Sequence, residues 1–303
     1  MSAEKLKVEF TKVAEGLLGA EGPVFNKNGQ LMMVAPEVEE EDGRSAGQIL
    51  KINLQNGQST VWCRPKFHGV GGIPAGCQCD QENNIWVADM RHGILKVSPD
   101  GHATQIVEEC EGQVMQGCND CAFDSRGNLY VSAPAGPIAP QPYQRSIKEP
   151  FGSLYCRQRN GDVVKLDTGF RFSNGLAVTA DDKTLIVAET VPRKLWAYDI
   201  IGDGQITNKR LWATLPNDSE DNGPDGMDFD CQGNLLVANW DGSHVDVFDH
   251  SGKHTYRIEC PFNKPSNVHF QPNSNRVYVT EHQYHGLWYF DWKFQGQKQY
   301  CEL

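Results

Sequence analysis

Three observations predict an all-β fold, a six-bladed β-propeller. A strand–turn–strand pattern recurs six times along the 303 residues. Successive copies lie roughly 40 to 55 residues apart, which is close to the length of a four-stranded propeller blade. The chain has 30 glycines and 16 prolines, which favours many short strands joined by turns. It shows no helical periodicity of useful length.

Each repeat begins with a hairpin of two largely apolar strands around a polar turn. The six predicted hairpins are Phe25–Ala35, Cys79–Ala88, Phe123–Ser132, Val178–Ala188, Phe229–Ala238 and Phe270–Thr280. Further apolar strands lie between them, as at Gln48–Ile52 and Gly93–Val97. The segment Leu6–Val13 alternates like a lone strand, and we expect it to pair with the last blade and close the ring. Residues 1–303 are therefore predicted to form a single domain.

Composition limits the partners that we expect. The formal net charge of −11 argues against binding to nucleic acid, which needs a basic surface. No apolar run is long enough to span a bilayer, and Met1–Lys5 is not followed by the apolar stretch of a secretory signal. We therefore expect a cytoplasmic monomer whose ten cysteines, including Cys118 and Cys121 with their metal-like spacing, are reduced thiols.

The innermost strand of each propeller blade lines the central channel, so equivalent positions in the repeats form rings around it. Four residues before the start of each hairpin, the repeats carry Glu21, Ala75, Asn119, Asn174, Asp225 and Ser266. Four of these six residues, Glu21, Asn119, Asn174 and Asp225, have side-chain oxygens of the kind that Ca²⁺ prefers. Zinc is disfavoured because no Cys or His belongs to this ring. The sequence therefore predicts a calcium ion in the channel.

A second ring lies three residues further along the same strands. It consists of Val24, Gln78, Ala122, Ala177, Asp228 and His269. Only Asp228 and His269, from neighbouring blades, are polar ligands of a suitable type. This pair predicts either a second ion in the channel or a buried Asp–His hydrogen bond, and the spacing alone does not choose between the two.

The second strand of each hairpin returns to the face on which the first strand began. Three residues after its Val, the repeats carry Glu37, Met90, Pro134, Thr190, Trp240 and His282. We expect these residues to form an outer ring around a largely apolar pocket above the ion. A long proline-rich loop, 136–152, leaves the same face, so Tyr143, Arg145 and Ile147 are further candidates to reach the pocket.

Several longer motifs carry a resemblance to a known family. They are Gly19–Phe25, Val34–Glu39, Gly71–Asp80, Met115–Asp124, Asp225–Asp230, Pro265–Asn267 and Thr280–His282. In these motifs the chain resembles the diisopropyl fluorophosphatases, which are calcium-dependent phosphotriesterases of the wider gluconolactonase-like propeller group. The resemblance covers nearly the whole chain.

The resemblance implies two calcium ions. Glu21, Asn119, Asn174 and Asp225 would bind the catalytic ion, while Asp228, His269 and the Val268 carbonyl would bind a structural one. The family's pocket positions correspond to Met90, Tyr143, Arg145, Thr190, Trp240, Ser266 and His282.

The implied activity is hydrolysis of organophosphate triesters and phosphorofluoridates, small molecules that are attacked at phosphorus with loss of fluoride or another leaving group. Asp225 is the candidate nucleophile and His282 a candidate base of lesser weight. Two alternatives remain. A sugar-lactone hydrolase would use the same metal but would favour a polar pocket, and a non-enzymatic calcium-binding propeller would need no open coordination site.

Overall fold

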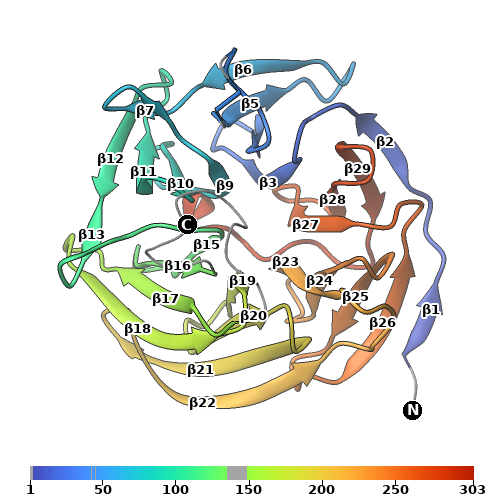
Figure 1. Cartoon of the computed structure of the whole chain (residues 1–303). Helices are drawn as coiled ribbons and strands as arrows, with labels where there is room; N and C mark the ends of the chain where they lie inside the picture. Colours follow the sequence, from blue (N-terminus) through green and yellow to red (C-terminus); the bar gives the residue numbers. More distant parts are fainter. Residues whose placement is uncertain (1–2, 42, 45, 135–148) are drawn as a thin grey trace.

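The computed structural model describes residues 3–41, 43–44, 46–134 and 149–303. Its strands form six blades arranged radially around a central channel, with the C-terminus lying at the centre of the ring (Figure 1). Consecutive strands within a blade are antiparallel, and the first strand of each blade is the innermost. The predicted six-bladed propeller is confirmed.

The first three blades follow one another along the chain. Blade 1 contains β3 (Glu21–Phe25), β4 (Leu31–Ala35), β5 (Gln48–Ile52) and β6 (Ser59–Cys63). Blade 2 contains β9 (Pro74–Cys79), β10 (Ile85–Asp89), β11 (Gly93–Val97) and β12 (Ala103–Val107). Blade 3 contains β15 (Cys121–Phe123), β16 (Leu129–Ala133), β17 (Gly152–Arg157) and β18 (Val163–Phe170). Two short hairpins, β7 (Lys66–Phe67) with β8 (Val70–Gly71) and β13 (Glu109–Cys110) with β14 (Gln113–Val114), connect these blades.

The remaining blades complete the ring, and a short 3₁₀ helix follows them. Blade 4 contains β19 (Ser173–Val178), β20 (Thr184–Glu189), β21 (Lys194–Gly202) and β22 (Gln205–Thr214). Blade 5 contains β23 (Gly223–Phe229), β24 (Leu235–Trp240), β25 (His244–Phe248) and β26 (His254–Glu259). Blade 6 contains β27 (Pro265–Phe270), β28 (Arg276–Glu281) and β29 (Gly286–Asp291), and the helix η1 is Tyr300–Glu302.

The N-terminal segment closes the ring, but as two strands. β2 (Thr11–Ala14) pairs antiparallel with β29 and supplies the fourth strand of blade 6, as expected. β1 (Glu4–Leu6) instead pairs parallel with β26 of blade 5, so the prediction of one strand over Leu6–Val13 was wrong. The chain crosses between the blades because Leu6, Val8 and Phe10 pack against the core that blades 5 and 6 share.

The hydrophobic core lies mainly between neighbouring blades. Val24 and Met32 of blade 1, for example, belong to the same buried cluster as Val87 and Leu95 of blade 2. Because each sheet is covered on both faces by its neighbours, the middle strands are buried along their whole length, as in β4 and β10. This packing holds the inner strands in fixed positions around the channel.

Each inner strand begins near the predicted ligands and ends at the opposite face of the propeller. On that opposite face, buried aspartates hold the hairpin turns. Asp80 in blade 2 accepts bonds from the backbone of Glu82 and Asn84 through Oδ1, and from the Asn84 amide and the Trp86 indole through Oδ2. The backbone and asparagine bonds recur at Asp124 in blade 3 and at Asp230 in blade 5. At Asp230 the indole donor is Trp292. These aspartates satisfy the polar groups of the hairpin turns.

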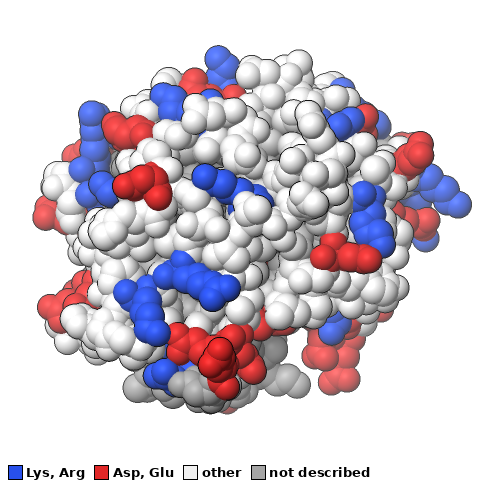
Figure 2. Space-filling view, turned by 90° about the horizontal axis from the view of Figure 1, so that it is seen from above, with Lys and Arg blue, Asp and Glu red and all other residues white. Residues whose placement is uncertain are grey.

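The surface seen in Figure 2 carries acidic and basic side chains that are intermixed along the rim of the ring. Exposed ion pairs on the surface of the protein include Lys66 with Glu40 and Arg276 with Asp291. Such pairs add little stability individually. Among the residues that the structure describes, no helix is both long enough and apolar enough to span a membrane.

Candidate functional site

The structure brings the four predicted calcium ligands together at one end of the channel, on four different inner strands or their approaches. Glu21 begins β3, Asn119 lies two residues before β15, and Asn174 and Asp225 lie within β19 and β23. All four side chains line a single cavity of about 370 Å³. The repeat alignment thus placed them correctly in space, although their role as ligands stays a prediction.

Irregular strand pairing accounts for how three of these side chains are presented. The register between the first two strands of the blade shifts between Glu21 and Val24 in blade 1. It shifts across the equivalent places in blades 4 and 5, around Asn174 and Asp225. A β-bulge adds a residue and redirects a side chain, which here releases the polar residue from the regular in–out alternation of the strand.

Glycines after the ring residues let the inner strands approach each other closely. A Cβ added to Gly175, which follows Asn174, would lie 2.2 Å from the backbone oxygen of Asp225. A Cβ on Gly226 would lie 2.1 Å from the Asn267 side chain in blade 6. Since real Cβ atoms cannot approach this closely, only glycine permits the tight packing of inner strands around the ligand ring.

Burial and a neighbouring carboxylate destabilise the charge of Asp225 in the ring. Burial is the main reason why the pKa of Asp225 lies well above its usual value, and the nearby charge of Glu21 raises it further. The Asn174 side chain opposes this by hydrogen bonding to Asp225. Asn174 Nδ2 also donates to Thr190 Oγ1 at 3.1 Å. Since Nδ2 makes this bond, the amide oxygen of Asn174 lies on the other side of the amide group.

A divalent cation fits this donor set. Two buried carboxylates at one place are unfavourable unless a proton or a cation compensates their charge, and the two amide oxygens add neutral ligands of the type Ca²⁺ accepts. Within the described part of the chain, no group of three or more His, Cys, Asp and Glu side chains is arranged to hold a metal. The ring therefore fits a hard cation bound by carboxylates and amides, and it lacks the Cys and His ligands typical of zinc.

The cavity above the ring is formed by strand ends from several blades. Of the predicted outer ring, Glu37, Thr190, Trp240 and His282 line it. Phe172 also lines it, which the sequence analysis missed because this residue lies in the turn before β19, outside the repeat-equivalent position. Its φ of 67° is the left-handed conformation of a tight turn, and no sequence signal marked it.

Two other predicted pocket residues, Met90 and Ser266, lie apart from the described lining of the cavity. Met90 is buried in a small cluster with Ile73 and Ala75. Ser266 is fully buried and bonds to the Ala20 carbonyl and the Thr280 hydroxyl. Neither is among the described residues that line the cavity. Tyr143, Arg145 and Ile147 lie outside the described residues, so their contribution stays a prediction.

His282 lies between two carboxylates at the wall of the cavity. Its Nε2 is 3.5 Å from Glu21 Oε1, and its Nδ1 is 3.5 Å from Glu37 Oε1. The Trp240 ring meets the imidazole edge-on, with 4.9 Å between ring centres. Although burial lowers the pKa of His282, the contacts with Glu21 and Glu37 outweigh it and raise the pKa to about 10. The two carboxylates thus favour the imidazolium form of His282, which suits an ion-pairing role better than that of a general base.

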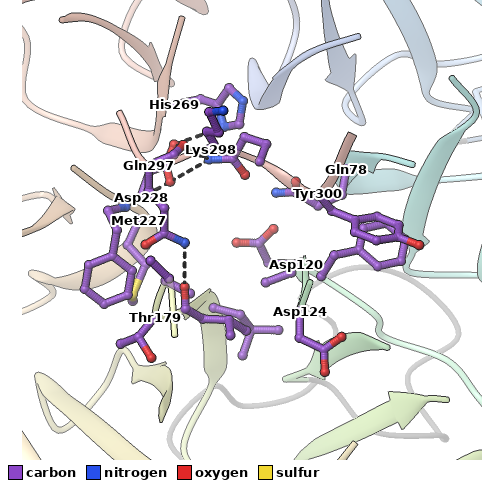
Figure 3. A pocket seen from close by; sticks show the side chains of 18 of the residues that line it. Gln78, Asp120, Asp124, Thr179, Met227, Asp228, His269, Gln297, Lys298 and Tyr300 are labelled. Carbon is purple, nitrogen blue, oxygen red and sulfur yellow. Dashed lines mark hydrogen bonds and ion pairs between the residues drawn. The ribbon is translucent and has the colours of Figure 1, made fainter. Parts of the chain in front are cut away.

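The opposite end of the channel contains the second predicted pair, together with the C-terminal segment (Figure 3). His269 Nδ1 is 3.3 Å from Asp228 Oδ2. The backbone N–H groups of Phe229 and Phe270 and the amide of Gln299 also donate to Asp228. Burial raises the pKa of Asp228 to about 7 and lowers that of His269 to about 4.

The geometry is compatible with both predictions for this pair, a buried Asp–His hydrogen bond and a second ion. The Asp228–His269 contact is present, but His269 Nε2 is buried and has no hydrogen-bond partner among the described residues. A buried imidazole nitrogen without a partner is unfavourable, and a bound ion would satisfy it. Val268 precedes His269 in β27 and also lines this part of the channel.

The propeller carries a ring of oxygen donors below a partly apolar cavity. Comparison with known proteins shows which family has these features. A family model described as SMP-30/Gluconolactonase/LRE-like region matches residues 17–283, and the chain belongs to this family. Within the family, the diisopropyl-fluorophosphatase of Loligo vulgaris is 53% identical over 300 residues, which cover 97% of this chain and 95% of that protein.

More distant relatives share the fold. The gluconolactonase of Zymomonas mobilis is 24% identical over 257 residues, covering 77% of this chain and 68% of that protein. Among solved structures, the calcium-binding protein regucalcin from Agrobacterium tumefaciens matches with a TM-score of 0.77 at 19% identity, covering 98% of both chains. At this identity the likeness shows the fold alone.

Proposed function

We propose that this protein is a calcium-dependent hydrolase of organophosphate triesters and phosphorofluoridates. The observation that carries the proposal is the ring of Glu21, Asn119, Asn174 and Asp225 below a cavity, in a chain that is 53% identical to a diisopropyl-fluorophosphatase. The cavity volume of about 370 Å³ suits a small-molecule substrate.

The four ring residues would hold the catalytic calcium ion. Ca²⁺ bound there would polarise a phosphoryl oxygen and neutralise the negative charge that develops on it. Asp228, His269 and the Val268 carbonyl would hold a second, structural ion. The buried contact between His269 Nδ1 and Asp228, next to Val268, supports this second site.

Asp225 is the proposed nucleophile. A carboxylate held by a cation needs no proton removed before it attacks, and its place in the cavity wall supplies the proximity. One of its oxygens forms a bond to phosphorus while the bond to fluoride breaks and fluoride leaves. Water then attacks the Asp225 carboxyl carbon, which releases the phosphate product and regenerates the carboxylate. In the alternative route, Asp225 orients a water molecule that attacks phosphorus directly.

A single turnover in ¹⁸O-labelled water, with enzyme in excess, separates these routes. The nucleophile route yields product that carries an unlabelled enzyme oxygen and leaves ¹⁸O in Asp225. Labelled product together with an unlabelled protein would rule out the route in which water attacks the Asp225 carboxyl carbon. His282 would hold Glu21 and Glu37 in place in either route, so we expect only a modest loss of activity in His282→Asn.

Lactone hydrolysis is the second candidate function, because the chain is 24% identical to a gluconolactonase. The aromatic side chains of Phe172 and Trp240 favour the phosphotriester reading, since a sugar lactone would be better matched by a polar wall. A substrate panel of phosphorofluoridates and sugar lactones, each with and without calcium, tests both. Calcium-dependent fluoride release supports the proposal, and turnover of lactones alone overturns it.

A further inference from the structure

Three neighbouring blades each contribute one residue of the second strand to the pocket. In all three, the residue directly before it is buried and polar. Glu189 precedes Thr190 in blade 4, Asn239 precedes Trp240 in blade 5, and Glu281 precedes His282 in blade 6. Their exposed fractions are 8%, 0% and 0%. Burying a polar side chain is costly unless it is fully hydrogen-bonded, so the bonds that these residues make are informative.

In blade 6, Glu281 spans the turn that contains His282. Its Oε2 accepts a bond from the Tyr284 backbone N–H at 2.9 Å, just beyond His282. Its Oε1 accepts a bond from the Trp288 indole at 3.3 Å, on the adjacent strand β29. The His282 N–H donates to the Lys264 carbonyl, so the backbone of this residue is tied on both sides.

In blade 4, Glu189 makes the same kind of bridge. Its Oε2 accepts a bond from the Trp196 indole at 2.7 Å, and its Oε1 accepts a bond from the Arg171 backbone N–H at 2.7 Å. The next residue, Phe172, lines the cavity and accepts the backbone N–H of Thr190. The carboxylate therefore links two walls of the pocket.

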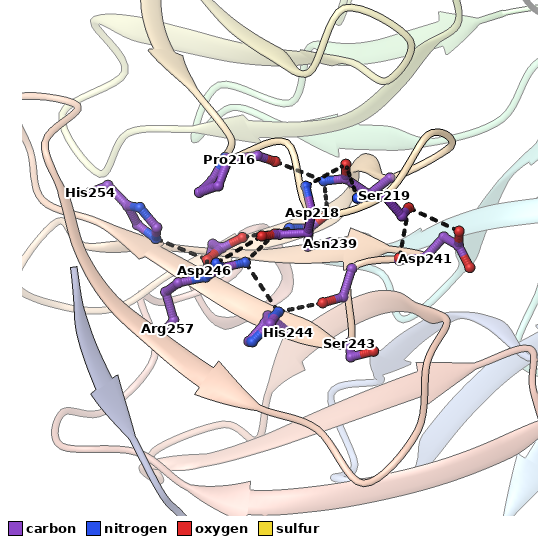
Figure 4. A network of polar contacts seen from close by, with 12 residues as sticks. Pro216, Asp218, Ser219, Asn239, Asp241, Ser243, His244, Asp246, His254 and Arg257 are labelled. Carbon is purple, nitrogen blue, oxygen red and sulfur yellow. Dashed lines mark hydrogen bonds and ion pairs between the residues drawn. The ribbon is translucent and has the colours of Figure 1, made fainter. Parts of the chain in front are cut away.

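In blade 5 an amide replaces the carboxylate, and the partner seven residues further on is an acid. Asn239 Nδ2 donates to Asp246 Oδ2 at 2.7 Å, inside a network with Arg257 and His254 (Figure 4). Asn239 Oδ1 accepts a bond from Asn222 Nδ2 at 3.0 Å. Because Asn222 directly precedes β23, this bond connects the strand end that carries Trp240 to the strand that carries Asp225.

From this recurrence we propose that Glu189, Asn239 and Glu281 are positioning residues that set the orientation of Thr190, Trp240 and His282, and through them the substrate selectivity of the pocket. In all three blades the side chain forms a hydrogen bond with the residue seven positions later, on the next strand. It forms a second bond either with the following turn or with a segment outside these two strands. Buried, fully bonded polar side chains hold neighbouring groups to a narrow range of positions. The inference rests on the proposed function only for its selectivity part.

The opposite face of the propeller supplies a matched control. Asp80 is buried like Glu281 and also accepts bonds from backbone N–H groups and from one indole, but it holds a turn far from the cavity. The variants Glu281→Gln, Glu189→Gln and Asp80→Asn each remove one charge and keep the shape. Glu281→Gln leaves one acceptor oxygen for two donors, the Tyr284 N–H and the Trp288 indole, so at least one of these bonds is lost. Trp288→Phe removes the indole bond directly and serves if Glu281→Gln does not fold.

The experiment measures kcat/KM for a small and a bulky phosphorofluoridate, and NMR signals of the His282 ring and the Trp240 indole in the calcium-loaded protein. We expect Glu281→Gln to change the ratio of the two rates threefold or more and to move the His282 signals. Glu189→Gln should change the ratio as well, whereas Asp80→Asn should lower only the melting temperature.

The rate measurements and the NMR signals test the proposed function and the positioning role separately. If the wild-type protein hydrolyses no phosphorofluoridate, the proposed function fails, while the NMR signals still test positioning. If the signals of His282 and Trp240 and the rate ratio all stay at wild-type values in Glu281→Gln and Trp288→Phe, the buried residues are structural only and the inference is overturned.

Discussion

The two ends of the channel contain similar polar groups in different settings. At one end, Glu21 and Asp225 face a cavity that is open to a small molecule. At the other end, Asp228 is surrounded by donors, including two backbone N–H groups and the Gln299 amide. Asp228 also lines a cavity, of about 330 Å³, but its oxygens already accept several hydrogen bonds. An acid whose oxygens are free to meet a ligand suits chemistry, whereas an acid that accepts many bonds from the protein suits structure.

The C-terminal segment produces much of this difference. Gln297 bonds to Phe229 of blade 5 and to Val178 of blade 4, and the Tyr300 ring packs on Phe123 of blade 3 with 4.7 Å between centres. The segment therefore crosses the channel mouth and ties several blades together (Figure 3). We therefore expect ions bound at the two proposed sites to be exchanged and used differently.

The strongest test of the comparison exchanges one acid at each end. Asp225→Asn should lower kcat by at least about a thousandfold, because it removes the proposed nucleophile and a calcium ligand together. Asp228→Asn should instead lower the melting temperature and leave kcat within about tenfold of wild type at temperatures where the variant is folded. Steady-state kinetics and thermal melts of both variants check this. Equal losses of activity in the two variants would abolish the distinction between a catalytic and a structural end.

Removal of calcium should affect both ends at once. A ligand that binds only the folded protein stabilises it by about 2.7 kcal/mol for each site at a hundredfold excess over its dissociation constant. A chelator should therefore abolish activity and lower the melting temperature. Isothermal titration of the stripped wild type should resolve two binding steps, and Asp228→Asn should lose one of them. A single step in the wild type would argue against the second ion.

Repeat register made the ligand ring predictable from sequence. Since Glu21, Asn119, Asn174 and Asp225 occupy one position of a repeat, alignment of the hairpins placed them around one axis without any knowledge of packing. The bulges beside three of these residues could not be predicted in this way, because they are shifts in the pairing of the first two strands within a blade. The close approach of the inner strands of neighbouring blades does not follow from the repeat spacing either. The glycines after Glu21, Asn174 and Asp225 were the available signal for that close approach.

Features outside the repeat were not predictable. Phe172 reaches the cavity from a turn, and its position depends on the left-handed backbone there. The C-terminal segment has no periodicity, so its path across the channel is determined by contacts with distant residues such as Phe123 and Asp228. Met90 was expected in the pocket from its place in the repeat, but its side chain packs into the small cluster with Ile73 and Ala75.

His282 gives the cavity end a pH dependence that can be measured in the metal-free protein. Its pKa is raised to about 10 in the folded state, from about 6.5 in an unfolded chain. A raised pKa means that its stabilising effect is complete below pH about 6.5 and is lost as the pH rises through about 10. We expect the wild type to be more stable than His282→Gln by roughly 1–2 kcal/mol at pH 6, with the difference shrinking by pH 9. Urea unfolding at the two pH values measures it, and a difference that grows with pH would contradict the ion pairs with Glu21 and Glu37.

The smallest expected effect on activity distinguishes two residues of the predicted outer ring. Trp240 lines the cavity and contacts His282 with its ring, whereas Met90 is buried away from the lining. Trp240→Leu should therefore change the ratio of rates for bulky and small phosphate substituents by about tenfold, or about 1.4 kcal/mol, because it changes the shape of the wall. Met90→Ala should leave that ratio unchanged and lower stability by about 2–5 kcal/mol, because it creates a cavity in the core. Competition assays with mixed substrates report the ratio directly and are insensitive to the fraction of folded enzyme. A shifted ratio in Met90→Ala would place this side chain in the pocket after all, and would extend the catalytic end of the channel into blade 2.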